Sequence, residues 1–490
     1  MGPASHATGL VGRSKTVELD EAIWLSLERH AGETLRAGLE RALRGAIRTR
    51  ALRPGVRLPA SRALAQHLGV SRGVVSDAYS QLEAQGFLIT RAREAPVIAA
   101  TQRSRPVPAE PEVDVRAARY DLSPTTPDVS LFPFARWLAA ARVVARRADA
   151  AVLDYRESRG ERVLRAALAD HLGRTRGVIA DPAQILIVQG TAQSVDLLLR
   201  VLRARGATRV AVEDPSHTRQ HERIQAMGLE IVAREVDDQG LIVDDLEADA
   251  VLVTPAHQFP TGCVLSGQRR RQLIDWSRAN SALIVEDDYD AEFRYDRDPV
   301  RALQGLAPEH VAQLGTVSKT LAPALRLGWL VVPAHLVDEA ERTKRLLDDF
   351  SPAFDQLILA ELLTRGDYDR HVRRARGIYR ARRDRVLSAL AKHLPELRVE
   401  GIAAGMHVLL RLPSEVNDDA IATDASLMGI RVPALSAFRI KPASSGGLVI
   451  GYGRLHESAV EPAIQALAHA MRPHLSAARG SQDPRLVTSN

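Results

Sequence analysis

The sequence predicts a multi-domain protein in which a small helix–turn–helix domain precedes a large α/β domain. Short helical segments separated by turns occur within about the first hundred residues, and the basic excess of the chain lies in the same part. From residue 120 onward, apolar strands alternate with helices, which is typical of a doubly wound, mostly parallel sheet with a smaller α/β lobe after it. The length of 490 residues fits two or three domains, and an apolar content of 45% can form large cores.

Charge is distributed unevenly along the chain. Residues 1–105 contain 16 Lys and Arg against nine Asp and Glu, a net charge of +7. The whole chain carries +6, so the other 385 residues sum to −1. A basic excess confined to one domain indicates a polyanionic partner there.

Cysteine usage and hydropathy predict the compartment. The single cysteine, Cys263, excludes an internal disulfide framework and fits a reducing cytosol. The first 15 residues lack the apolar core of a signal peptide, and no apolar run reaches about 18 residues. We therefore expect a cytoplasmic protein that does not bind a membrane, and we predict no metal site.

The N-terminal part divides into helices and turns. Residues 1–20 have no periodic apolar pattern and are predicted to be disordered, whereas Thr34–Arg50 has apolar residues at helical spacing. After a Pro-Gly turn, Ser61 is predicted to cap a short helix, and Ser71 is predicted to cap a second helix over Arg72–Gln85. Such a pair forms a helix–turn–helix whose second helix suits the major groove of DNA.

The stretch PGVRLPASRALAQHLGVSRGVVSDAYSQLEAQGFL resembles the GntR-type winged helix, which implies a DNA-binding domain over residues 21–99. The resemblance implies DNA contacts by Arg62, Ser71 and Arg72, a contact of Arg57 with the DNA backbone, and a positioning role for Tyr79. The alternative is a solvated three-helix unit, because basic helical faces are common.

The wing of this domain departs from the family pattern. Its segment, Phe87–Ile98, has no glycine at the tip, where the family usually has glycines. Arg91 and Arg93 can still reach a minor groove or phosphates, so both are candidate DNA contacts.

The remaining boundaries follow from composition and pattern. Residues 100–119 are rich in proline and charge and predict a semi-extended linker, and residues 476–490 predict a disordered tail. The α/β domain covers residues 120–475, with a large lobe at about 150–335 and a small lobe made of 120–149 and 336–475. The strands expected in it are Gln184–Val188, Val210–Val212, Glu230–Ala233, Ala250–Val253, Leu283–Val285, Val311–Leu314, Val408–Arg411 and Leu448–Tyr452.

The most informative stretch is GTVSKTLAPALRLGW at 315–329. Its lysine, Lys319, lies among small and hydroxyl residues, and a lysine enclosed by protein can have a lowered pKa and form a Schiff base with an aldehyde. Thr316 and Ser318 offer hydroxyls to a phosphate, and Arg326 offers a planar, charged fork. An aldehyde and a phosphate on one molecule suggest pyridoxal 5'-phosphate (PLP), although a lone Ser-Lys pair is more often a surface turn.

The stretch ALIVEDDY at 282–289 supports a PLP site. It predicts a buried parallel strand with acids at its carboxyl end, where α/β sheets bind ligands. Asp287 can keep the pyridine nitrogen protonated, and the Tyr289 hydroxyl can meet the ring oxygen. Together with Lys319 and Arg326, they resemble the cofactor set of fold-type I aminotransferases, and EDDYDAEFRY resembles the MocR/GabR branch of transcriptional regulators. The resemblance implies PLP as the cofactor.

The resemblance to fold-type I aminotransferases implies further contacts. GTAQS follows a strand and opens a helix, so Gly190, Thr191 and Ala192 are placed to hold the phosphate. VEDPSH places His217 where an aromatic ring usually stacks on the pyridine. LDYRESRG resembles the segment whose tyrosine reaches the phosphate of the partner subunit, which implies a homodimer with Tyr155 acting across the interface. The alternative for that tyrosine is an ordinary surface loop.

Two departures from the family pattern concern activity. The enzymes usually place an asparagine before Pro-Thr-Gly, but this chain has Phe259 there, and His257 or Gln258 is a candidate substitute. The enzymes also fix the substrate carboxylate with an arginine on a late strand. Here SSGGLVIGYGRL has no arginine before Arg454, and nothing in the spacing selects Arg439. A carboxylate clamp is therefore not predicted.

Two functions from different classes follow. The first is a transcriptional regulator that binds operator DNA and senses PLP, or an amine or amino acid, through an internal aldimine on Lys319. The second is a catalytically active PLP-dependent aminotransferase that carries a DNA-binding domain. The recognition helix and the missing carboxylate-binding arginine favour the regulator. Residual transamination activity is left open as a second property.

Overall fold

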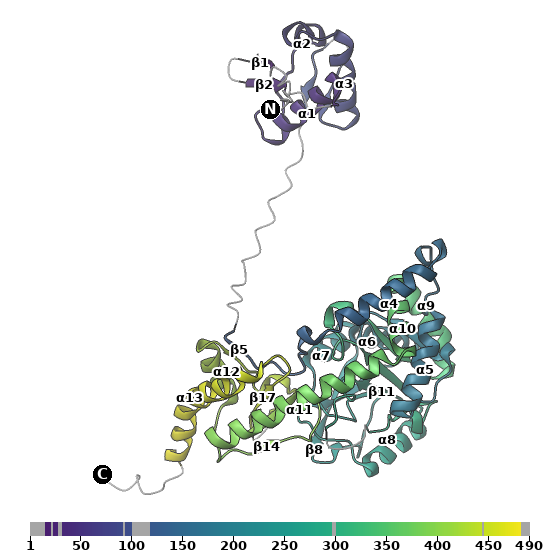
Figure 1. Ribbon diagram of the computed structural model, residues 1–490, viewed down its shortest axis with the longest axis vertical. Helices are drawn as coiled ribbons and strands as arrows, with labels where there is room; N and C mark the ends of the chain where they lie inside the picture. The colour runs from purple at the N-terminus through teal and green to yellow at the C-terminus, as the bar shows by residue number, and fades with distance from the viewer. Residues whose placement is uncertain are drawn as a thin grey trace, which may run out of the picture. The chain divides into compact units, whose positions relative to one another are not determined.

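The computed structural model describes residues 32–91, 94–99, 118–295, 300–442 and 445–481, and the backbone alone of 15–20, 23–27 and, within the last range, 479–481 (Figure 1). The chain divides into two compact units, Met1–Asp114 and Val115–Asn490. Among the residues described, no helix has the length and apolar character that a membrane crossing requires. The predicted linker and most of the predicted disordered ends lie outside the described residues.

The N-terminal unit is a winged helix–turn–helix, as the sequence predicts. Its helices are α1 (Leu35–Arg48), α2 (Ser61–Leu68) and α3 (Arg72–Ala84), and its wing is β3 (Leu88–Ile89) paired antiparallel with β4 (Val97–Ile98). Part of the segment predicted to be disordered instead forms β1 (Lys15–Asp20), because the short apolar run of β2 (Ile23–Leu27) provides an antiparallel partner.

The two predicted helix caps have different outcomes. Ser71 caps α3, since its hydroxyl oxygen accepts the Val74 N–H at 3.4 Å. Ser61 does not cap α2, because Ala60 occupies the cap position and Ser61 is the first helical residue. Its hydroxyl instead accepts a hydrogen bond from Arg72 Nε at 3.4 Å. The unit is held by one buried cluster that includes Leu39, Leu43, Leu64, Leu68, Val75, Leu82, Leu88 and Ile98.

An eight-stranded sheet forms the centre of the second unit, with the order β6-β13-β12-β11-β10-β7-β8-β9. The strands are β6 (Ile185–Val188), β7 (Arg209–Asp214), β8 (Glu230–Asp237), β9 (Gly240–Leu241), β10 (Ala250–Val253), β11 (Leu283–Asp288), β12 (Val311–Thr316) and β13 (Gly328–Val331). The five strands from β12 to β8 are parallel, which confirms the predicted sheet type. The two strands absent from the sequence prediction, β13 and β9, are short and run antiparallel to their neighbours.

Helices cover both faces of this sheet (Figure 1). On one face pack α6 (Thr191–Ala204), α7 (Thr218–Ala226) and α9 (Val337–Asp348). On the other face pack α4 (Phe134–Arg147), α5 (Arg162–Arg176), α8 (Gly267–Asn280) and α10 (Ala353–Thr364). The sequence does not reveal α10, because its buried residues surround the helix instead of forming one stripe.

The small lobe gathers at one end of this unit (Figure 1). It contains β5 (Tyr120–Asp121) paired with β16 (Ile430–Arg431), a sheet of β14 (Val399–Glu400), β15 (His407–Arg411) and β17 (Gly447–Gly451), and the helices α12 (Asp418–Leu427) and α13 (Glu457–Ser481). The long α11 (Asp367–His393) joins the lobes: Val372 packs in the core of the large sheet and Leu390 in the core of the small lobe.

The lobe boundaries differ from those predicted. α4, α9 and α10 lie in the ranges assigned to the small lobe, 120–149 and 336–475, yet their apolar residues pack on the large sheet. Sequence position does not show which core an amphipathic helix joins. The predicted tail also begins too early, because α13 continues as a helix to Ser481.

Candidate functional site

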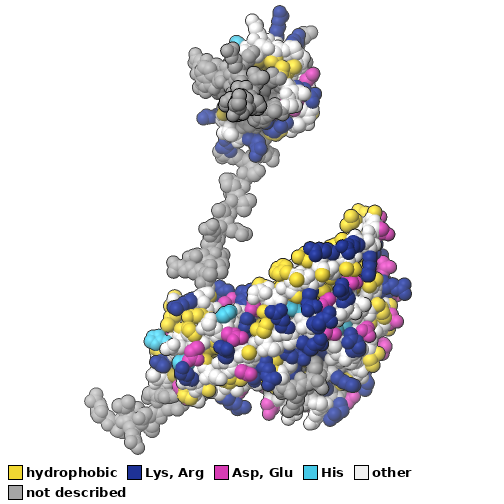
Figure 2. Space-filling model, viewed as in Figure 1, with side chains coloured by type: hydrophobic (Ala, Val, Ile, Leu, Met, Phe, Trp, Pro, Cys, Tyr) yellow, Lys and Arg dark blue, Asp and Glu magenta, His cyan; other side chains and the backbone are white. Residues whose placement is uncertain are grey.

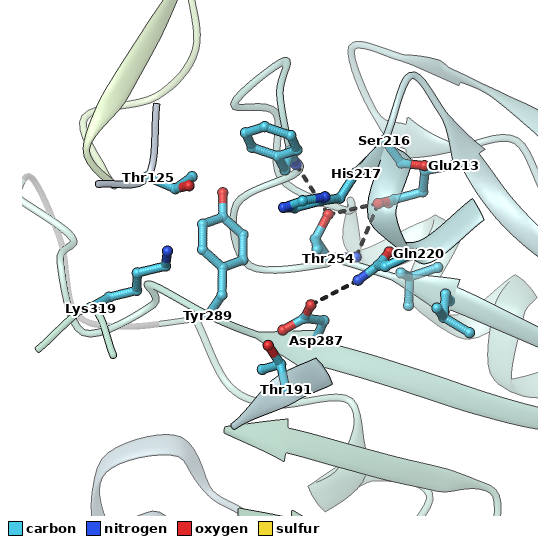
Figure 3. A pocket seen from close by; sticks show the side chains of 13 residues that line it. Thr125, Thr191, Glu213, Ser216, His217, Gln220, Thr254, Asp287, Tyr289 and Lys319 are labelled. Atoms are coloured by element: carbon cyan, nitrogen blue, oxygen red, sulfur yellow. Dashed lines mark hydrogen bonds between the residues drawn. The ribbon is translucent and has the colours of Figure 1, made fainter. Parts of the chain in front are cut away.

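A cavity lies at the carboxyl ends of β10 and β11, beside the N-terminus of α6 (Figure 3). It is lined by Thr125, Thr191, Glu213, Ser216, His217, Gln220, Leu252, Val253, Thr254, Phe259, Asp287, Tyr289 and Lys319. The lining thus brings together five residues that the sequence selected from separate motifs. This is the edge at which open α/β sheets bind ligands.

Lys319 enters the cavity from the turn that follows β12 (Figure 3). Burial lowers the pKa of its amine, while the nearby carboxylates of Asp290 and Asp287 act in the opposite direction. The amine makes no hydrogen bond to a described residue. A desolvated lysine amine of this kind is more readily neutral, and therefore nucleophilic, than one in water.

Asp287 lies at the end of β11 and points into the same space (Figure 3). Gln220 Nε2 donates to its Oδ2 at 3.0 Å, whereas Oδ1 has no hydrogen-bond partner among the described residues. Burial, followed by the negative charge of Asp288, raises the pKa of Asp287 to about 7. A buried carboxyl oxygen without a partner is suited to an N–H or cationic group of a ligand. The sequence prediction missed Gln220, whose only signal is its place three residues after His217 on α7.

The Tyr289 hydroxyl lies 3.1 Å from Nδ1 of His257, and the same nitrogen lies 3.0 Å from Oδ2 of Asp290. All three side chains are buried. The amide of Gln258 is occupied elsewhere, since its Nε2 donates to two backbone carbonyls and its Oε1 accepts from Thr261. Of the two candidates for the missing asparagine, His257 is therefore the one that reaches the tyrosine at the site.

His217 also lines the cavity and lies at the start of α7. Its ring lies 5.6 Å from the ring of Phe259, at an interplanar angle of 35°. Burial, followed by the positive charge of Lys319, lowers the pKa of His217 to about 4. The ring is therefore neutral near pH 7 and presents a flat, uncharged face to the cavity.

The N-terminus of α6 supplies an anion-binding element. Gly190 has a φ of 92° and provides no side-chain cap, so the amides of the first turn, including those of Thr191 and Ala192, are not capped by a side chain. The guanidinium of Arg326 packs against Gly190 and donates to the Gln189 carbonyl. Free amides, a helix dipole and a guanidinium together suit a phosphate.

The two hydroxyls before Lys319 have different surroundings. Thr316 is buried, and its hydroxyl lies 2.9 Å from Ser318 Oγ and 3.2 Å from the Leu327 carbonyl oxygen. It also accepts the Ser318 N–H at 3.1 Å. Thr316 therefore supports the turn, and Ser318, which is only half-buried, has the more accessible hydroxyl.

No arginine is among the described residues that line the cavity. Arg454 donates to Asp121 at 3.1 Å and is half exposed, and Arg439 lines a different pocket. Tyr155 also lies outside the lining: it is 87% exposed, and its ring lies 5.9 Å from that of Phe350. Among the described residues of one chain, neither a carboxylate clamp nor the tyrosine contact is completed.

Both lobes contribute to the surroundings of the cavity. Asp214, the last residue of β7, accepts the backbone N–H groups of Ile440 and Lys441 at 3.0 and 2.9 Å. The ring of Phe438 packs on Phe259 at 5.0 Å. The sequence gives no signal for these contacts, because they join segments that lie far apart along the chain.

The predicted DNA contacts are arranged around α2 and α3. Arg62 and Arg72 are exposed near the starts of these helices, and Arg57 is exposed near the wing, 3.8 Å from Glu94. Tyr79 is buried and its hydroxyl donates to the Pro59 carbonyl at 3.0 Å, which ties α3 to the segment before α2. Arg91 is exposed in the wing. Arg93 lies outside the described residues.

Comparison with known proteins first defines the class. Residues 125–467 match the family model of aminotransferase class I and II, and residues 35–98 match bacterial regulatory proteins of the gntR family. The fold resembles that of Pyrococcus horikoshii kynurenine aminotransferase, solved in complex with PMP, at a TM-score of 0.67 and 24% identity over 72% of this chain and 91% of that one. The chain combines a GntR-type DNA-binding domain with a PLP-dependent aminotransferase fold.

Two relatives define the family more narrowly. The HTH-type pyridoxine biosynthesis transcriptional regulator PdxR of Corynebacterium glutamicum is 32% identical over 91% of this chain and 98% of its own length. The probable rhizopine catabolism regulatory protein MocR of Rhizobium meliloti is 29% identical over 91% and 95%, respectively. The chain belongs to the MocR-type family of PLP-dependent, DNA-binding transcriptional regulators, which confirms the resemblance found in the sequence.

Proposed function

We propose that this regulator senses PLP itself, through covalent binding at Lys319, and adjusts its affinity for operator DNA accordingly. The observation that carries this proposal is the composition of the cavity: Lys319, Asp287 and Tyr289 are all present, but the described lining includes no arginine. Such a site can hold a pyridine ring and an aldehyde, but it offers no guanidinium for the carboxylate of an amino acid. The pyridoxine-related name of the PdxR relative agrees with this effector.

The residues fit the cofactor at each of its polar groups. Asp287 Oδ1, which lacks a partner, would accept the pyridine N–H, and Tyr289 would meet the ring oxygen while His257 orients its hydroxyl. The first-turn amides of α6 and Arg326 would bind the phosphate, and Lys319 would hold the aldehyde end of the cofactor. When bound, PLP supplies an electrophilic aldehyde and an electron sink.

We further propose that the functional unit is a cytoplasmic homodimer. Tyr155, which is almost fully exposed within one chain, would reach the phosphate site of the partner subunit. A large exposed aromatic side chain is consistent with an interface. Other exposed apolar side chains in the same unit include Phe134, Leu138, Leu153 and Leu346.

The test is DNA binding by cofactor-free protein, measured by fluorescence anisotropy at one stated salt concentration with and without PLP. The operator would be selected from randomised DNA by the wild-type protein, and pyridoxal without phosphate would serve as the ligand control. We expect PLP to change the operator Kd of the wild type and to leave that of Lys319→Ala unchanged. An equal response of both proteins would contradict sensing through Lys319.

A second candidate function is transamination, which the intact set of Lys319, Asp287 and Tyr289 favours. Twenty-seven per cent identity to aromatic-amino-acid aminotransferase 1 of Thermococcus litoralis, over 68% of this chain, also supports it. Sustained conversion of an amino donor with a 2-oxo acid over many turnovers would establish the enzyme. A single half-reaction would leave the sensor as the better account.

A further inference from the structure

A second cavity, of about 590 Å³, lies between the last turn of α5 and the first half of α11. Five arginines contribute to its lining: Arg174, Arg176, Arg301, Arg373 and Arg376. The cavity shares no lining residue with the cofactor cavity. Figure 2 shows Lys and Arg side chains gathered over the length of α11.

Arg176 is the buried element of this cavity. Only 3% of its surface is exposed. Its Nε donates to Asp288 Oδ2 at 2.9 Å, and its Nη2 forms an ion pair with the same oxygen at 2.8 Å. Neither Nη1 nor Nη2 completes a hydrogen bond in the described part of the chain. Both nitrogens are also shielded from the cavity, so Arg176 contributes its positive charge to this site and not a direct contact.

The other arginines add positive charge that carboxylates do not cancel. Arg301, Arg373 and Arg376 form no ion pair with a carboxylate among the described residues, and Arg376 donates only to the backbone carbonyl of Glu292, at 2.9 and 2.6 Å. Arg174, by contrast, is paired with Asp170 at 2.9 Å.

The cavity also contains two acids, Asp369 and Glu292. Asp369 lies 3.4 Å from His171 Nδ1, but burial lowers the pKa of His171, so this ring does not offset the carboxylate near neutral pH. Burial raises the pKa of the Glu292 carboxyl above its usual range, which reduces its negative charge near neutral pH. The balance in the cavity therefore remains positive.

From this arrangement we propose that the cavity binds a small molecule that carries a phosphate group. Several guanidinium groups around one open cavity match the three oxygens of a phosphate better than a single carboxylate, and the volume is that of a small-molecule site. The recessed charge of Arg176 favours a small ligand that enters the cavity over the backbone of a DNA duplex, which would meet only the exposed arginines.

The position of this site relative to the cofactor site follows from strand geometry. Asp287 and Asp288 are consecutive residues of β11, and successive side chains of a strand point to opposite faces. Asp287 therefore faces the cofactor cavity, while Asp288 pairs with Arg176 on the other side. A ligand in this cavity would therefore be linked to the cofactor strand through the ion pair between Arg176 and Asp288.

The test is calorimetric titration of inorganic phosphate, and separately of glycerol 3-phosphate, into the full-length protein saturated with PLP. Sodium chloride at matched ionic strength controls for salt, and glycerol is the neutral control ligand. Arg301→Ala/Arg373→Ala removes two exposed side chains without breaking the buried Arg176–Asp288 pair. Arg380→Ala is the matched control, because Arg380 is exposed on α11 seven residues after Arg373, outside the cavity.

We expect saturable binding with one site per chain that is weakened about tenfold or more in the double variant and is unchanged in Arg380→Ala. Absence of saturable binding to the wild type, or equal binding by all three proteins, would overturn the proposal. Loss of operator affinity in the double variant without any phosphate binding would assign these arginines to DNA instead. The result does not depend on the effector proposed above, because the altered residues do not touch the cofactor cavity.

Discussion

Replacing Arg72 by alanine tests whether α3 recognises DNA sequence. Arg72 is the first residue of α3 and is exposed, and N-terminal residues of a recognition helix are the ones that meet base edges in the major groove. The change leaves the Ser71 cap of α3 in place. Alanine is also the best helix former, so the helix itself should persist.

The expected magnitude follows from the contacts of Arg72 in the free protein. Among the described residues, its side chain forms one hydrogen bond, the exposed one to Ser61 Oγ at 3.4 Å, which is close to the limit for a hydrogen bond and holds the side chain weakly. The guanidinium is therefore available to DNA at little cost. A bidentate contact of arginine with guanine contributes about 1–3 kcal/mol, so Arg72→Ala should weaken operator binding by about 5- to 150-fold.

The assay is fluorescence anisotropy with the selected operator and with a scrambled duplex, each over a series of salt concentrations. Arg72→Ala should lose affinity for the operator more than for the scrambled DNA. Arg57→Ala should weaken both alike and lower the salt slope by about 1, as expected for a phosphate contact. Arg36→Ala, on α1 and paired with Glu40 at 3.3 Å, is the control. Wild-type affinity and discrimination in Arg72→Ala would refute the assignment of α3 as the recognition helix.

Three further predictions concern the larger unit. Burial raises the pKa of Asp287 to about 7, so the folded, cofactor-free protein holds this proton more tightly than the unfolded chain does. The resulting stabilisation of the folded state is complete below about pH 4 and is lost as the pH rises to about 7. Asp287→Asn should therefore raise the free energy of unfolding of the cofactor-free protein by up to about 3 kcal/mol more at pH 8 than at pH 5, as denaturant unfolding at the two pH values would show, and a larger gain at pH 5 would contradict this. His257→Ala should shift the visible absorbance of bound PLP, and the pH midpoint of that absorbance, because His257 acts on the cofactor through Tyr289. Tyr289→Phe should give a similar shift. If the two effects simply add in the double variant, the result would argue against the contact between His257 and Tyr289. Tyr155→Ala should weaken PLP binding, as titration of PLP would show, without lowering the thermal midpoint of the cofactor-free protein. Unchanged affinity for PLP would indicate that Tyr155 is an ordinary surface residue.

Local motifs account for what could be predicted of the fold and the site. Lys319, Asp287 and Tyr289 occur in short segments whose strand–turn pattern already places them at the carboxyl edge of a parallel sheet. The cap of Ser71 depends only on neighbours three residues away, and it was predicted correctly. The cap of Ser61 was not, because α2 begins one residue earlier than predicted, with Ala60 at the cap position and Ser61 as the first helical residue.

Contacts between distant segments account for most of what could not be predicted. Gln220 reaches Asp287 from helix α7, and His257 reaches Tyr289 from the loop after β10. These pairs depend on how strands and loops pack, which one sequence does not record. The lobe boundaries failed for the same reason, since an amphipathic helix such as α4 shows that it has an apolar face but not which core it joins.

The position of the cofactor cavity suggests how its occupant could affect the rest of the molecule. Its walls are connected to both lobes: the Asp214 carboxylate holds two backbone amides of the small lobe, and Phe438 packs on Phe259 beside His217. A ligand that changes the position of His217 or Phe259 must therefore alter these contacts or be opposed by them. The effect on DNA binding is limited by the ligand's preference for one lobe arrangement over the other. Couplings of this kind are typically about 1–3 kcal/mol, so PLP is expected to change operator affinity by about 5- to 150-fold, as a graded response and not an absolute switch.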